Sequence, residues 1–119
     1  MTAPTLLAVP SLSGAFRVGA EIADLLAAAD PTLYLTASVR PFDEVAFLAH
    51  NASLDAVADA MAVAGIDTPT YDPPHMDHPY GWVGGSVTRD GVRIVVRAQV
   101  ADDDLDAARD RFPAGSAGF

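Results

Sequence analysis

The sequence contains no cysteine and no lysine. The absence of cysteine excludes disulfide scaffolds, thiolate metal sites and cysteine nucleophiles, and it argues against a small secreted domain. The seven basic residues are all arginine and stand against sixteen acidic residues, of which all but Glu21 and Glu44 are aspartate, so that the net charge is -9. This acidic balance opposes binding to nucleic acid or to an anionic membrane surface.

Long apolar runs are also missing. The longest is far shorter than the roughly 20 residues that a membrane-spanning helix needs, and residues 1–10 lack the basic start of a signal peptide. We therefore expect a cytoplasmic protein with no membrane partner. Hydrophobic residues make up 50% of the chain, which favours a folded core over disorder. The 119 residues fit a single α+β domain over 1–119, with an N-terminal arm at 1–12 and a C-terminal tail at 113–119.

Two amphipathic segments near the ends of the chain predict helices. Apolar residues recur at helical spacing over 14–29, with Ser13 as the expected N-cap and Pro31 just beyond the end. A last helix is predicted over 102–112. The acidic residues at its start would interact favourably with the positive end of the helix dipole, and Pro113 would end the helix.

A third helix is predicted over 54–64. Ser53 is its expected N-cap, and Gly65 stands where a left-handed residue commonly ends a helix. The segment 67–79 that follows contains four prolines. It is predicted to be a loop, since proline is poorly tolerated inside helices and strand ladders.

Strands are indicated where apolar and polar residues alternate. Residues 32–39 alternate without interruption and predict a half-buried strand. Residues 44–50 alternate as well, although the same letters also suit a helix. We favour a second strand, joined to the first in a hairpin.

The clearest local signal is the pair Asp90-Gly91. These two residue types supply the positive φ angles of a type I′ turn between two alternating runs. The turn places Arg89 opposite Val92 and so sets the register of a hairpin that extends back to 81 and on to 100. A slip by one residue would bury arginines in the core, so the register is well specified.

The predicted order of elements is α-β-β-α-β-β-α. We expect a four-stranded, mostly antiparallel sheet with two to three helices packed mainly on one face. The sheet residues expected beneath the helices are apolar, namely Leu33, Leu35, Val83, Val87, Ile94, Val96 and Val100.

Two stretches of the chain carry a resemblance to known sequences. The run Glu-Val-Ala-Phe-Leu-Ala-His-Asn-Ala-Ser-Leu-Asp-Ala-Val at 44–57 leads to Ala-Gly-Ile at 64–66, and Gly-Val-Arg-Ile-Val-Val occupies 91–96. Together they resemble small acidic proteins of unassigned function from actinobacteria and their phages and mobile elements. The resemblance covers about half of the chain and implies no active site.

Motifs for catalysis or metal binding are weak. His75, Asp77 and His78 are metal-capable, with His50 as a distant further ligand, but no helix fixes their spacing. No serine lies in a Gly-x-Ser-x-Gly motif, and the glycines within 81–85 lie in a strand instead of preceding a helix. We expect no metal, no cofactor and no enzymatic activity.

The polar face of the predicted sheet is the best candidate for a binding surface. Its candidate residues are Tyr34, Arg40, Trp82, Arg93 and Arg97. Trp82 and Arg97 are near-diagonal neighbours in the predicted register, within reach of a cation–π contact. Aromatic residues and arginine are enriched at protein interfaces. The alternative is that the segment 67–79 or the last helix covers Trp82 while the arginines pair with surface acids.

We therefore favour an interaction module that binds a protein partner or self-associates, for instance as a homodimer. A second hypothesis is an acidic decoy that mimics the charge of nucleic acid. A third is a ligand-binding protein or enzyme with a pocket beneath the segment 67–79, formed by His75, His78, Tyr71 or Arg40.

Overall fold

The computed structural model describes residues 11–41, 43–77 and 79–115 of the chain. Over these ranges the fold is α+β, with three α-helices, five strands and a short 3-10 turn, η1. In chain order the elements are α1 (Leu12–Ala29), β1 (Tyr34–Val39), β2 (Glu44–His50), α2 (Leu54–Val63), β3 (Thr70–Asp72), β4 (Gly81–Arg89), β5 (Val92–Val100), η1 (Asp102–Asp104) and α3 (Leu105–Arg111).

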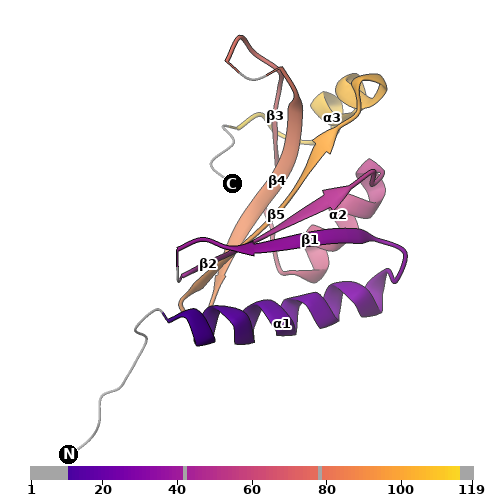
Figure 1. The fold of residues 1–119 in the computed structure, drawn as a ribbon. Coiled ribbons are helices and arrows are strands. Elements are labelled where there is room, and N and C mark those ends of the chain that lie inside the picture. The colour runs from indigo at the N-terminus through magenta and orange to yellow at the C-terminus, as the bar shows by residue number, and fades with distance from the viewer. Residues whose placement is uncertain (1–10, 42, 78, 116–119) are drawn as a thin grey trace, which may run out of the picture.

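The five strands form one mixed sheet in the order β1-β2-β5-β4-β3 (Figure 1). β2 and β5 run parallel, and the other three neighbouring pairs are antiparallel. The sheet is therefore mostly antiparallel, but the prediction of four strands is wrong. The ambiguous segment 44–50 is a strand hairpinned to β1, in agreement with the interpretation favoured from the sequence.

The strand that sequence reasoning missed is β3, which lies inside the segment 67–79 predicted to be a loop. Prolines on both sides restrict it to three residues, too few to show an alternating pattern. Its central residue, Tyr71, donates its N–H to the carbonyl of Pro113 at 2.8 Å and accepts from the N–H of Gly115 at 3.0 Å. The first part of the tail predicted at 113–119 is thus attached to the edge of the sheet.

The β4–β5 hairpin has the predicted register along its whole length, with Arg89 opposite Val92. Asp90 and Gly91 have φ angles of 53° and 80°, which are the left-handed values that a type I′ turn requires. The register decides which side chains of β4 and β5 enter the core, and so it also decides which side chains remain on the other side of the sheet.

All three α-helices contribute buried residues to a single core on one side of the sheet. The predicted core face is confirmed: Val83, Ile94, Val96 and Val100 are buried, and Leu33, Leu35 and Val87 pack against them. The last helix differs from the prediction, because the segment 102–112 is divided into η1 and α3.

The helix ends follow the expected capping chemistry with one correction. The N-cap of α1 is Ser11 and not Ser13, since the Ser11 hydroxyl accepts from the N–H of Gly14 at 3.0 Å. The N-cap of α2 is Ser53, as predicted. Gly65 follows α2 with a φ of 87°, the left-handed conformation that ends many helices.

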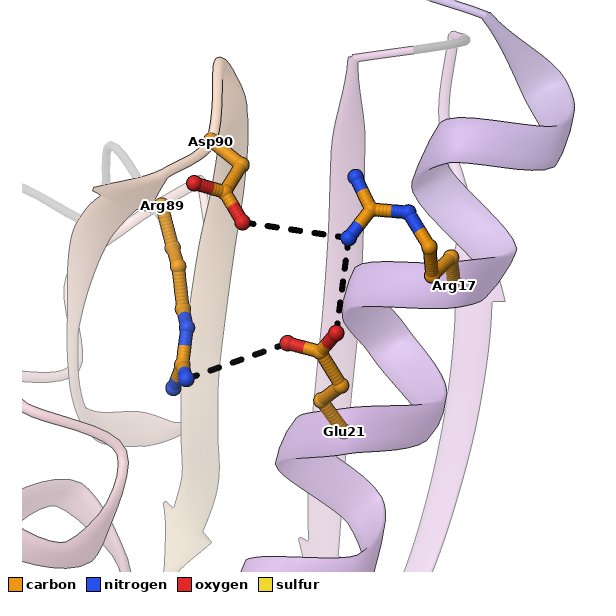
Figure 2. A network of polar contacts seen from close by, with 4 residues as sticks. All are labelled: Arg17, Glu21, Arg89 and Asp90. Carbon is orange, nitrogen blue, oxygen red and sulfur yellow. Dashed lines mark hydrogen bonds and ion pairs between the residues drawn. The ribbon is translucent and has the colours of Figure 1, made fainter.

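An ion-pair network joins α1 to the tip of the β4–β5 hairpin (Figure 2). Arg17 lies 3.4 Å from Glu21 and 3.8 Å from Asp90, and Arg89 lies 3.8 Å from Glu21. The four side chains are 42% to 59% exposed, so each pair contributes about 0–1 kcal/mol. Two of the arginines are therefore engaged by acids on the helix side of the sheet.

Candidate interaction surface

The side of the sheet that faces away from the core is called the open face here. It consists of the even-numbered residues of β1 to β4, the odd-numbered residues of β5, and Arg40, which follows β1. The strand residues that belong to the core with the helices all have the opposite parity. The five predicted interaction residues all lie on the open face, namely Tyr34, Arg40, Trp82, Arg93 and Arg97.

Trp82 and Arg97 lie together on the open face, as the register predicts. The Arg97 guanidinium carbon is 5.3 Å from the centroid of the Trp82 ring, a cation–π distance. Both residues are half-buried, and Nε of Arg97 is buried without a hydrogen-bond partner among the described residues. Burial lowers the pKa of Arg97, as does the charge of Arg40, while Glu44 opposes the shift. Arg97 is thus a partly desolvated cation whose donor capacity is incompletely used.

A second cluster on the open face is centred on Glu44. Its carboxylate lies 2.8 Å from Arg40 and 2.6 Å from Arg93, and its side chain is only 17% exposed. Sequence reasoning did not assign this residue to the site. The available signal was that Glu44 begins a strand in a chain with only two glutamates. Its pairing with Arg93 depends on β2 lying beside β5, which local patterns do not reveal.

Tyr34 lies in a third cluster, at the β1 edge of the open face. Its ring is 4.9 Å from the ring of His50, and His50 Nε2 is 2.9 Å from the hydroxyl of Thr36. Tyr34 is 64% exposed. The five predicted residues therefore share one face but form three clusters, and only Trp82 and Arg97 touch each other as predicted.

A groove of about 650 Å³ lies where β2 and β5 end. Its polar lining comes from the strand ends, the start of α2 and η1: His50, Asn51, Ser53, Trp82, Gln99 and Asp104. Crevices at the carboxyl ends of parallel strands are common ligand sites in open sheets. Because this groove exists only where the two parallel strands meet, sequence reasoning could not locate it without the strand order.

The residues of the third hypothesis do not converge. Tyr71 is buried in the core on β3, whereas Arg40 follows β1 at the opposite edge of the sheet. His75 is exposed, with Nε2 4.0 Å from Oδ1 of Asp72. In the described part of the chain no three metal-capable side chains gather at one point. His78 lies outside the described residues.

Comparisons with known proteins return no match: no protein-family model, no curated protein and no solved structure matches this chain. Within the described ranges, none of the helices has the length and apolar character needed to cross a bilayer.

Proposed function

We propose that this chain is a cytoplasmic, non-enzymatic interaction module that binds an acidic segment of a protein partner through the open face. The observation that carries the proposal is the state of Arg97. A partly desolvated arginine stacked on a tryptophan, with a buried donor left without a partner among the described residues, is a poor arrangement for stability alone. It is a good arrangement for receiving a carboxylate.

Charge complementarity favours an acidic partner. The strands of the open face bring together Arg40, Arg93 and Arg97, against the two carboxylates of Glu44 and Asp72. The chain as a whole carries a net charge of -9. The open face is thus more positive than the remainder of the surface, which would steer an acidic segment to it and away from the helices.

The composition of the open face suits a binding hot spot. Tryptophan, tyrosine and arginine are the residue types that carry most binding energy at interfaces. A partner carboxylate beside the Arg97 guanidinium would form a charge-assisted pair with it, and an apolar partner side chain could cover the Trp82 ring.

The acidic-decoy hypothesis has less support. Glu21, Glu44 and Asp55 are held in ion pairs with arginines, so part of the negative charge is neutralised within the chain. These acids also lie on separate elements, namely α1, β2 and α2. A mimic of nucleic acid would need its carboxylates free and aligned.

A displayed library of random peptides, selected against the purified chain, tests the proposal. We expect the enriched peptides to be rich in aspartate and glutamate and to quench the fluorescence of Trp82, the sole tryptophan. Arg97→Gln and Trp82→Ala should each weaken binding of such a peptide by about thirtyfold, the effect of losing a hot spot of about 2 kcal/mol. Arg109→Gln is the matched control, since this arginine lies on α3 with 68% of its side chain exposed.

Two results would count decisively against the proposal. One is the enrichment of peptides without acidic residues. The other is an enriched acidic peptide that Arg109→Gln weakens as much as Arg97→Gln does, since binding would then reflect non-specific charge attraction.

A further inference from the structure

The two edges of the sheet differ in whether the outer side of the edge strand is hydrogen-bonded. At one edge, β3 is three residues long and its outer side is hydrogen-bonded to the chain that follows α3. At the other edge, β1 has six residues, and no strand of the described residues pairs with its outer side. The residues of β1 include no charge and no proline, which are two of the devices by which natural edge strands avoid pairing.

The outward backbone groups of β1 follow from its pairing with β2. The N–H of Arg40 donates to the carbonyl of Glu44 at 2.9 Å, so this residue pair is a hydrogen-bonded pair of the antiparallel ladder. Such pairs alternate along an antiparallel ladder. The even-numbered residues of β1 therefore bond to β2, and the N–H and C=O groups of Leu35, Ala37 and Val39 point outward.

An apolar groove of about 390 Å³ runs between α1 and β1, with Ala37, Val39, Phe16 and Ala20 in its lining. On α1, Phe16 is 59% exposed. The helix thus presents apolar residues toward the β1 edge in addition to the stripe that it buries in the core. The backbone of α1 runs alongside β1 (Figure 1).

We propose that the outer side of β1 pairs with β1 of a second copy of this chain, antiparallel, about a two-fold axis midway between the two copies of Ala37. In this register Ala37 faces the partner's Ala37, and Leu35 faces the partner's Val39. Each of these residues offers outward backbone groups, so the paired residues exchange their hydrogen bonds. The apolar side chains of Leu35 and the partner's Val39 meet on the core side of the joined sheet.

Self-complementarity favours a second copy over a foreign strand as the occupant. The same axis places Thr36 opposite the partner's Ser38, and Tyr34 opposite the partner's Arg40, on the open face. It also brings together the two copies of the apolar groove between α1 and β1, so that each Phe16 lies near the contact between the two β1 strands. Because β1 carries no charge, no like charges of the two copies face each other along the paired strands.

This pairing uses the edge of the sheet and does not rest on the proposed function of the open face. It would nevertheless join the two five-stranded sheets into one continuous sheet with two copies of the Trp82–Arg97 pair. A binding partner with two acidic segments would then gain avidity without any new contact.

Charge-swapped variants test the two-fold register. For the wild-type chain, light scattering after size exclusion should measure a mass twice the 12.4 kDa of one copy. Ala37→Arg and Ala37→Glu each place like charges opposite each other at the axis and should be monomeric. An equimolar mixture of the two should form the dimer again, because unlike charges now face each other. Ala62→Glu, at an exposed position of α2, is the control and should leave the dimer intact.

A single thiol gives a second test that tolerates small losses of stability. The chain has no cysteine, so Ala37→Cys introduces the only one. Directly opposed residues of a hydrogen-bonded antiparallel pair have Cα atoms about 5.5 Å apart, within disulfide range. Mild oxidation should therefore link Ala37→Cys into a covalent dimer well before Ala62→Cys.

A wild-type monomer at every concentration would overturn the inference. So would a dimer that persists in both charged variants, or a mixture of the two that stays monomeric. Binding of a selected acidic peptide to the monomeric Ala37→Arg chain separates this outcome from a failure of the proposed function.

Discussion

Replacing Arg97 by methionine should leave the chain as stable as before or make it more stable, while weakening partner binding about thirtyfold, as expected for Arg97→Gln. Two effects of opposite sign set the magnitude. The buried Nε without a hydrogen-bond partner among the described residues costs about 1–3 kcal/mol, and methionine removes this cost. The cation–π contact with Trp82 at 5.3 Å contributes about 0.5–1 kcal/mol at a partly exposed site. The expected net change is a gain of about 0–2.5 kcal/mol.

Methionine is the appropriate replacement because it keeps an unbranched side chain over the same surface. Arg97 lies between Leu48 on β2 and Gly84 on β4 in the sheet register. A thioether in this position can still contact the Trp82 ring. The substitution therefore changes charge and hydrogen bonding much more than it changes packing.

The assay is urea unfolding at equilibrium, followed by far-UV circular dichroism and by the fluorescence of the sole tryptophan. A higher midpoint with an unchanged slope is the expected result. Arg109→Met is the control, since its side chain is 68% exposed and its replacement should change the free energy of unfolding by less than about 0.5 kcal/mol. If Arg97→Met instead loses more than about 1 kcal/mol, Arg97 stabilises the fold, and the reasoning that assigns it to a partner is wrong.

Three further predictions concern the fold. Gly85→Ala should cost about 1–3 kcal/mol in the urea assay, because a Cβ there would lie 2.6 Å from Cγ2 of Ile66; an equal cost in the background of Ile66→Ala would contradict this cause. Burial raises the pKa of the Tyr71 hydroxyl above 10.0. The contribution of this group to the free energy of unfolding should therefore be fully present below about pH 10 and be lost as the pH rises further, and Tyr71→Phe should reduce this loss. Ser53→Ala should lose about 1 kcal/mol, because the hydroxyl caps α2 at 3.1 Å from the N–H of Ala56; no loss in thermal unfolding would show that the cap contributes nothing.

Local signals were sufficient for most of the elements. A type I′ turn requires positive φ angles at two successive residues, and Asp90 and Gly91 are among the few residue types that tolerate them. This one turn therefore predicted a hairpin and its register. Ser53 and Gly65 marked both ends of α2 for similar reasons. Because the register of the hairpin sorts side chains between two faces, the position of Trp82 opposite the core also followed from the sequence.

The parts that could not be predicted depend on contacts between distant residues. β3 is stable as a strand because Tyr71 is paired on both sides, with β4 and with the chain after Pro113, and neither partner is visible in three residues of sequence. The Arg40–Glu44–Arg93 cluster likewise requires β2 to lie beside β5. Local patterns establish which residues are apolar, but they do not establish which strands become neighbours.

The parallel contact between β2 and β5 has a consequence for how the chain folds. Glu44 and Arg93 are 49 positions apart in the sequence, so this seam closes a long loop and gains its contacts only after that entropy is lost. The antiparallel hairpins on either side of the seam are local and can form early. Folding is thus expected to end when the two preformed hairpins pair along β2 and β5. The rate of that last step will depend on the contacts between these two strands alone.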